Sequence, residues 1–326
     1  MDGLEEERVT RMPLPKPLPP GSPSAVDVVG FGLNAVDHIC RVSRFPSFDS
    51  KMHLDGYACE PGGQVATALV ALRRWGLRTA YLGAFGDDAL AERSRTALAA
   101  EGVDIDGGLV RAGVPNQLAV ILVDRRSGER TVLWYRDPAL AIRPEELARA
   151  RVCAGRVLHL DGYDREAAIT AAGWAREAGI ATVLDLDSPG RDAERLLAVT
   201  DIAVVSRECA EQLSGSTDPA VALEGLAGSG SALVGISLGR DGVIARSDGR
   251  TFHVRGFPVL PVDTTGAGDV LHAGIIYGYL YGYLAGMNVE EMLRFASAAA
   301  ALQCTRLGAQ PAIPTLAQIR QLLEGT

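Results

Sequence analysis

Residues 263–280 read DTTGAGDVLHAGIIYGYL, a polar, glycine-containing turn that runs directly into an apolar stretch typical of a buried helix. Backbone amides in the first turn of a helix have no partner inside it, so Gly266, Ala267 and Gly268 are predicted to form an anion site. Asp269 follows directly, where its carboxylate could accept a proton from an attacking hydroxyl. The combination suggests phosphoryl transfer. The alternative is an ordinary helix start in which Asp269 complements the helix dipole.

Outward from this stretch, short β-branched segments alternate with helical segments rich in alanine and leucine from Val26 onward. Examples are GGQVATALVALRRWG (62–76), TAYLGAF (79–85), VLHLDGY (157–163) and ATVLDLD (181–187). This βαβ alternation predicts an α/β fold with a doubly wound, mostly parallel sheet flanked by helices. Ligands of such folds bind at the carboxyl ends of the strands.

Two segments, at about 38–60 and 115–137, break this alternation. The first contains the alternating HICRV before Pro46, and the second reads LAVILVD, the turn RRSGE and RTVLWY, which predicts a hairpin. We expect a small β-sheet that acts as a lid over an active site, with a static edge hairpin as the alternative. Residues 1–25, rich in proline, are expected to be a disordered tail.

Composition limits the possible partners. The 326 residues carry a net charge of −8 with scattered Lys and Arg, which argues against a nucleic-acid or anionic-membrane partner. Five widely spaced cysteines argue against a disulfide framework and a C-x-x-C metal site, and they favour the cytoplasm. The N-terminal residues contain no apolar segment typical of a signal peptide or membrane span.

The segment VDVVGFGLNA (26–35) matches the dinucleotide fingerprint G-x-G-x-x-A, so a dehydrogenase is a rival interpretation. The chain continues with VDHICRV, an alternating strand pattern, where the fingerprint requires a helix. A P-loop sequence is absent. Asp37 and Asp161 would follow strands, at the same edge of the sheet as Gly62 and Gly63. Carboxylates and open backbone there suit the hydroxyls of a sugar.

The motif DTTGAGD, with A-G-I-I at 273–276 and the paired glycines before a helix, resembles the signatures of the PfkB, or ribokinase-like, family of carbohydrate kinases. The resemblance extends from Val26 to the C-terminus, so 26–326 would be one kinase domain with a lid. The details GGQVATA, VLDLD, VVSRECAEQLSG and FASAAAALQCTR look most like the branch containing sulfofructose kinase and ketohexokinase-like sugar kinases.

The resemblance implies an ATP- and Mg²⁺-dependent transfer of the γ-phosphoryl group to a primary hydroxyl of a monosaccharide, with Asp269 as the base. It implies that the sugar is held by Asn34, Asp37, Gly62, Gly63, Thr67, Asp161 and Arg136. It places the nucleotide at Ser206, Ser237, Gly239, Gly242, Thr264, Thr265 and Ser297. In potassium-dependent relatives, the positions of Asp263, Thr265 and Gly308 hold a monovalent cation. Thr67 departs from a common Asn, and Ser206 and Cys209 replace the family's N-x-x-E.

We expect a ketohexose-type sugar or an acidic derivative as the substrate, and a homodimer formed through the lid. Arg136 and Arg165 are the candidates for binding an acidic group. Only 6% of the residues are aromatic, which favours a sugar over a nucleoside, although Trp134 and Tyr135 in the lid could stack on a base. The alternatives are a nucleoside kinase of the same family, an NAD-dependent dehydrogenase and a catalytically silent sugar-binding protein.

Overall fold

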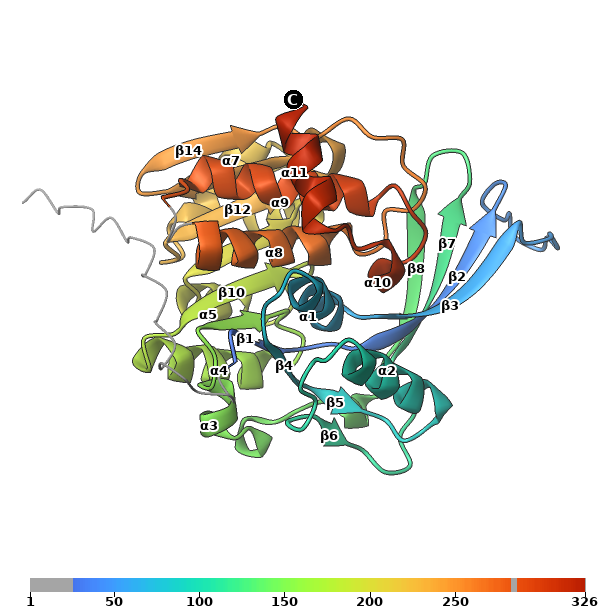
Figure 1. Cartoon of the computed structure of the whole chain (residues 1–326), viewed down its shortest axis with the longest axis horizontal. Helices are drawn as coiled ribbons and strands as arrows, with labels where there is room; N and C mark the ends of the chain where they lie inside the picture. The colour runs from blue at the N-terminus through green and yellow to red at the C-terminus, as the bar shows by residue number, and fades with distance from the viewer. Residues whose placement is uncertain (1–25, 283–285, 326) are drawn as a thin grey trace, which may run out of the picture.

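The computed structural model describes residues 26–282 and 286–325, with an eight-stranded sheet at its centre (Figure 1). The strands are, in spatial order, β14 (Arg250–Val254), β13 (Val243–Ser247), β12 (Leu233–Ser237), β11 (Ile202–Ser206), β10 (Ala181–Leu186), β9 (Val157–Leu160), β1 (Val28–Phe31) and β4 (Thr79–Leu82). Neighbours from β4 through β12 are parallel, whereas β13 and β14 add an antiparallel hairpin at one edge. The parallel strands are largely apolar because helices cover both of their faces.

Helices on the two faces enclose two hydrophobic cores. One face packs against α1 (Gln64–Arg74), α8 (Ala267–Tyr277), α9 (Val289–Gln303) and α11 (Leu316–Glu324). The other packs against α3 (Arg149–Val152), α4 (Arg165–Glu177), α5 (Ala193–Ala198), α6 (Arg207–Ser214) and α7 (Pro219–Ala227). Further elements are α2 (Ala89–Ala100), α10 (Ala309–Ala312), the 3₁₀ turns η1 (Pro138–Leu140), η2 (Pro144–Glu146) and η3 (Gly239–Asp241), and the π-helical turn η4 (Gly278–Gly282).

A second sheet projects from one side of this body (Figure 1). Its strand order is β3 (Gly56–Gly62), β2 (Ala35–Val42), β7 (Leu118–Asp124) and β8 (Arg130–Tyr135). Strand β2 begins only four residues after the end of β1, so the chain passes directly from the carboxyl end of a main-sheet strand into the second sheet. The short strands β5 (Ala84–Phe85) and β6 (Leu109–Val110) form a separate ladder.

These observations confirm the predicted fold class, a mostly parallel sheet flanked by helices with a small second sheet. The interpretation of GFGLNA as a dinucleotide fingerprint is wrong, because β2 stands where the fingerprint requires a helix. The second sheet runs from Ala35 to Gly62 in its first part, slightly wider than the segment expected at 38–60. The expected tail, residues 1–25, lies outside the described residues.

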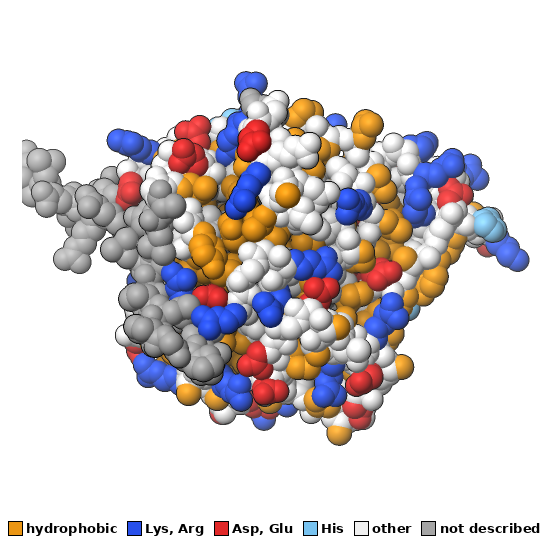
Figure 2. Space-filling view, in the orientation of Figure 1, with side chains coloured by type: hydrophobic (Ala, Val, Ile, Leu, Met, Phe, Trp, Pro, Cys, Tyr) orange, Lys and Arg blue, Asp and Glu red, His pale blue; other side chains and the backbone are white. Residues whose placement is uncertain are grey.

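The surface carries both charge signs. On the face drawn in Figure 2, basic and acidic side chains are interspersed. Among the residues that the structure describes, no helix is both long enough and apolar enough to cross a bilayer.

Candidate active site

The predicted anion site is formed by the turn before α8 and the first residues of that helix. Gly266 adopts a left-handed φ of 77°, and a Cβ there would lie 3.0 Å from Ala309 Cα, so glycine suits this N-cap. Ala267 donates its amide to Thr264 O at 3.3 Å, whereas the amides of Gly266 and Gly268 have no hydrogen-bond partner among the described residues. Open amides at a helix N-terminus are suited to bind phosphate.

Asp269 lies in the first turn of α8, beside these amides, with a partly exposed side chain. The surrounding protein raises the pKa of this carboxyl to about 7, mainly because burial disfavours the charged form, and the nearby Asp185 carboxyl adds to the increase. The guanidinium of Arg130 acts in the opposite direction. A carboxyl with a pKa near neutrality is well matched to accept a proton from a hydroxyl.

Asp37 on β2 is a second carboxyl at this site and is only 5% exposed. Burial raises its pKa to about 7, and Asp269 is the next largest cause, so the two carboxyls lie within electrostatic range of each other. Gly62 leaves room for this group, because a Cβ there would overlap the Asp37 carboxylate. Gly63 has a φ of 93°, and a Cβ there would lie 2.5 Å from Asn34 Cα. The paired glycines therefore give the Asp37 carboxylate space and let β3 pass directly into α1.

Asn34 and Asp161 are both buried and both hydrogen-bonded inside the protein. The Asn34 amide donates to the Tyr81 hydroxyl at 2.8 Å and also to a backbone carbonyl. The Asp161 carboxylate accepts the amides of Leu33 and Tyr163, at 2.6 and 3.1 Å. These contacts fix the three-residue connection between β1 and β2. Their roles as sugar ligands stay predictions.

Three other residues predicted near the substrate are also placed by the structure. Arg136 forms an ion pair of 2.8 Å with Asp164, so the charge of its guanidinium is already balanced. Thr67 is fully buried on α1, and its hydroxyl has no partner among the described residues. Arg165 donates to the carbonyls of Ser188 and Pro189, while its Nη1 has no hydrogen-bond partner within the described residues.

The residues predicted near the nucleotide come from several elements. Ser237 ends β12, and Gly239 and Gly242, both with positive φ, form the turn into β13. Ser297 is buried on α9 with a hydroxyl that has no partner among the described residues. Ser206 caps α6, and its hydroxyl donates to the carbonyl of residue 187 at 3.2 Å. Ser206 and Ser237 are opposite each other on the paired strands β11 and β12, at the carboxyl edge of the sheet.

Arg130 is a site residue that the sequence interpretation missed. It begins β8, and its Nη1 donates to the Thr264 hydroxyl at 2.8 Å. The Thr264 amide in turn donates to Gly128 O, at 3.2 Å, so the β7–β8 turn contacts the loop before α8. The positive charge of Arg130 lowers the pKa of both Asp37 and Asp269, so this residue of the second sheet lies within electrostatic range of both carboxyls. The only feature of the sequence that could have indicated Arg130 is its position as a basic residue next to a tight turn.

His272 and Asp185 form a second group that the sequence did not reveal. Both are buried, and both lie within electrostatic range of Asp269. His272 Nδ1 lies 3.3 Å from Asp185 Oδ2 and 2.9 Å from Gly268 O, and its Nε2 lies 3.1 Å from Val204 O. Burial lowers the pKa of the His272 imidazole, and burial raises the pKa of the Asp185 carboxyl well above its usual range. The group links α8, which carries the candidate base Asp269, to β10 and β11.

The three residues predicted to hold a monovalent cation do lie together. Asp263 Oδ1 accepts both the amide and the hydroxyl of Thr265, at 2.9 and 2.6 Å. Asp263 Oδ2 accepts the amide of Gly308 at 2.9 Å. The carbonyls of Thr265 and Gly308 accept hydrogen bonds from the Gln303 amide. Each of these oxygen atoms is therefore already engaged by a donor from the chain itself.

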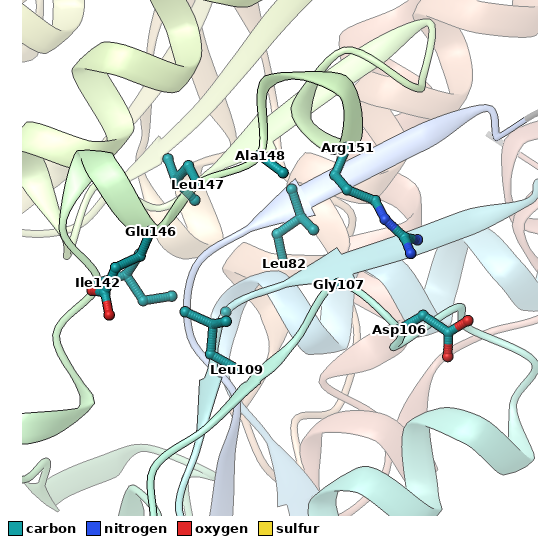
Figure 3. A pocket seen from close by; sticks show the side chains of 10 residues that line it. Leu82, Asp106, Gly107, Leu109, Ile142, Glu146, Leu147, Ala148 and Arg151 are labelled. Atoms are coloured by element: carbon teal, nitrogen blue, oxygen red, sulfur yellow. The ribbon is translucent and has the colours of Figure 1, made fainter.

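A pocket elsewhere on the molecule does not belong to this group (Figure 3). The residues that line it include Leu82, Leu109, Ile142, Glu146, Leu147 and Arg151. It contains none of the predicted site residues, and its Glu146 is already paired with Arg111 at 2.7 Å.

Comparison with known proteins confirms the family that the motif DTTGAGD resembles. Residues 26–316 match the pfkB family of carbohydrate kinases. A fructokinase of Solanum tuberosum is 30% identical over 91% of this chain and 96% of its own length. A solved structure from Agrobacterium tumefaciens is 26% identical, with a TM-score of 0.84 over 92% of this chain and 99% of that one.

A second solved structure, an Escherichia coli protein in complex with ATP and Mg²⁺, has a TM-score of 0.77 at 24% identity and covers 92% of this chain and 100% of that one. That likeness concerns the fold. The match to the family model and the similarity to the fructokinase show that the chain belongs to the PfkB family of carbohydrate kinases.

Proposed function

We propose that this carbohydrate kinase transfers the γ-phosphoryl group of ATP to a primary hydroxyl of a monosaccharide, with Asp269 as the base. The observation that carries the proposal is the Asp269 carboxyl, which has a pKa of about 7, lies beside two open amides and is within electrostatic range of the buried Asp37 carboxyl. Asp269 takes the proton of the hydroxyl as the new O–P bond forms. The bond from phosphorus to the ADP oxygen breaks, and ADP leaves with the electron pair.

The charge that develops on the transferring group is stabilised by fixed donors. The amides of Gly266 and Gly268 supply two of them at the helix N-terminus. Arg130 brings a positive charge from the lid, held in place by its hydrogen bond to Thr264. Positioning and electrostatics provide nearly all of the catalysis in reactions of this class.

Mg²⁺ would neutralise the nucleotide phosphates when it is bound with ATP. The residues present fit such an ion, which keeps several waters and takes only one or two carboxylates from the protein. Asp187 follows β10 with an exposed side chain, and its charge contributes to the raised pKa of Asp269, so it lies near the reacting groups. We propose Asp187 as the carboxylate that orients the bound ion.

We propose a ketohexose-type sugar, or an acidic derivative, over a nucleoside. Asp37 can accept hydrogen bonds from two hydroxyls, and Gly62 and Gly63 leave the backbone beside it open. For an acidic sugar, Arg165 has an unpartnered Nη1, whereas Arg136 is already paired. The nucleoside alternative rests on Trp134, which is 54% exposed and contacts Tyr163 edge-on.

A panel of acceptors tests this substrate class. We expect the kcat/KM for fructose or for an acidic ketohexose derivative to exceed that for adenosine and cytidine. A site built on hydroxyl hydrogen bonds leaves its own polar groups unpaired with an analogue that lacks one. Release of ADP is measured for fructose, ribose, ketodeoxygluconate, sulfofructose, adenosine and cytidine. A nucleoside preferred over every sugar by about tenfold, or about 1.4 kcal/mol, would overturn the choice.

We also propose that the second sheet is a lid and that it pairs with the lid of a second copy. Every residue of β8 is exposed, and this edge strand carries Leu133 and Tyr135 on one face at 56% and 51% exposure. Exposed apolar residues on a sheet edge favour a two-fold contact with another copy. Figure 2 shows apolar side chains along this projecting sheet.

Light scattering tests the pairing. We expect a dimer for the unmodified protein and a monomer for Leu133→Glu, because the new charge would be buried in the contact. Val221→Glu is the matched control, since Val221 is 54% exposed on α7, away from the lid. A monomeric unmodified protein, or equal masses for both variants, would contradict the proposed contact.

We propose the cytoplasm as the compartment of the protein. Its five cysteines are all free thiols, which is usual for proteins of a reducing environment.

A further inference from the structure

Three backbone carbonyl oxygens converge on one nitrogen atom beneath the anion site. Gln303 lies at the end of α9 with a fully buried side chain. Its Nε2 donates to Thr265 O, Gly308 O and Ala309 O, at 3.0, 3.1 and 2.7 Å. An amide NH₂ has only two hydrogens, so the carbonyls outnumber the protons that face them. The orientation of the amide follows from these acceptors, because no carbonyl group of Gln303 could take this place.

Convergent carbonyl oxygens that come from separate backbone segments are the usual surroundings of a desolvated monovalent cation. Here the positive end of an amide dipole lies at their centre. Asp263, the nearest carboxylate on the same loop, directs both of its oxygens to protons of Thr265 and Gly308. The residues that the family resemblance assigns to a potassium ion therefore do not fit it, since the chain already supplies their donors.

We propose that the Gln303 side chain takes the place of a monovalent cation and makes the activity of this kinase independent of potassium. The inference rests on the proposed function. Thr265 O belongs to the residue directly before Gly266, the N-cap of the anion site, and a Cβ on Gly266 would lie 3.0 Å from Gln303 Nε2. Gln303 is thus a positioning residue. It holds the Thr265 carbonyl, next to the open amides, against the backbone of residues 308–309.

The test compares salts at equal ionic strength. We measure kcat and KM in potassium chloride and in tetramethylammonium chloride, whose cation is too large for the space. The kcat of the unmodified protein should differ by less than about twofold between the two salts. A tenfold difference would correspond to about 1.4 kcal/mol. Activation of the unmodified protein by potassium of about tenfold or more would overturn the proposal.

Gln303→Ala should turn the protein into a potassium-responsive enzyme. In tetramethylammonium chloride its kcat should fall by roughly 10- to 100-fold, because three carbonyls lose their donor and the anion site loosens. The KM for the sugar should change little, because Asp37 is untouched. Potassium or ammonium should restore most of the kcat, since either cation can occupy the vacated space. Loss of activity without rescue by either cation would contradict the proposal, because it would indicate a purely structural role.

A second readout does not require substrate. Potassium should raise the melting temperature of Gln303→Ala relative to tetramethylammonium, because binding to the folded state stabilises it, and should leave the unmodified protein unchanged. Gln310→Ala is the matched control, because Gln310 is a buried glutamine of the adjoining segment whose Nε2 has no partner among the described residues. The melting temperature of Gln310→Ala should be the same in both salts.

The salt comparison on the unmodified protein still decides the matter if Gln303→Ala fails to fold. An unmodified protein that is inactive with every sugar in both salts would count against the proposed function. Potassium activation of an otherwise active kinase would count only against the role of Gln303.

Discussion

Asp269→Asn is expected to fold normally and to lose about 10²–10⁴ in turnover, the usual effect of removing a general acid or base. Asn keeps the size and polarity of the side chain but cannot take the proton of the acceptor hydroxyl. Turnover is measured with the best acceptor of the panel at saturating ATP. Turnover close to that of the unmodified protein would remove Asp269 from the role of base.

The same variant should not be less stable than the unmodified protein. The folded-state pKa of Asp269, about 7, lies above its ordinary value of 3.8, so the folded protein holds this proton more tightly than the unfolded chain does. The free energy of unfolding therefore falls as the pH rises from about 4 to 7, and the cost is fully present above pH 7. Asn removes that cost, so Asp269→Asn should melt at the same or a higher temperature at pH 8.

The pH dependence of kcat/KM reports the same carboxyl. Catalysis requires the deprotonated form, so the kcat/KM of the unmodified protein should fall as the pH drops below about 7. The limb should report Asp269 and Asp37 together, because the pKa of each is raised to about 7 and the charge of Asp269 contributes to the shift of Asp37. A limb that begins only near pH 4 would show that the site does not raise these pKa values.

Arg130→Met is expected to lower kcat by roughly 10²-fold, in the range observed when one donor to a developing oxyanion is removed. Met keeps much of the length of the side chain but removes the charge that β8 brings to the loop before α8. The KM for the sugar should change much less, because Asp37, Gly62 and Gly63 remain in place. Steady-state kinetics with varied sugar and varied ATP separate the two parameters.

Arg126→Met is the matched control for Arg130. Arg126 lies in the same β7–β8 turn, but its guanidinium pairs with Asp124 at 2.6 Å, on its own hairpin. Its loss should leave kcat within about twofold, because its charge is paired within the hairpin and Arg126 is not among the groups that shift the pKa of Asp37 or Asp269. Equal effects of the two substitutions would indicate a general disturbance of the hairpin and would contradict a specific role for Arg130.

Much of the fold could be predicted from the chain because its signals are local. Alternating β-branched and alanine-rich segments predicted the parallel sheet, and HICRV and RTVLWY predicted strands outside it. The turn at Gly266 predicted the helix start, because a glycine before an apolar helix allows the left-handed conformation observed there. Each of these inferences depends on residues close together in the sequence.

The contacts of the site could not be predicted in the same way. Arg130 and Thr264 are 134 residues apart, and Gln303 reaches Thr265 across 38. Sequence also cannot tell whether a carboxylate at a strand end meets a ligand or the backbone. The sequence placed both Asp37 and Asp161 at strand ends, but Asp37 lies within β2. Its carboxylate accepts no hydrogen bond from the described residues, whereas that of Asp161 accepts two from backbone amides.

Direct observation of the product tests the central claim. Phosphorus NMR follows the γ-phosphoryl group of ATP during incubation with the preferred sugar of the panel and Mg²⁺. We expect the γ-phosphate signal to be replaced by that of a phosphate monoester on a primary carbon of the sugar, with an equal amount of ADP, and no such signal with Asp269→Asn within the same time. Release of inorganic phosphate in place of a sugar ester, or equal ester formation by Asp269→Asn, would contradict the account.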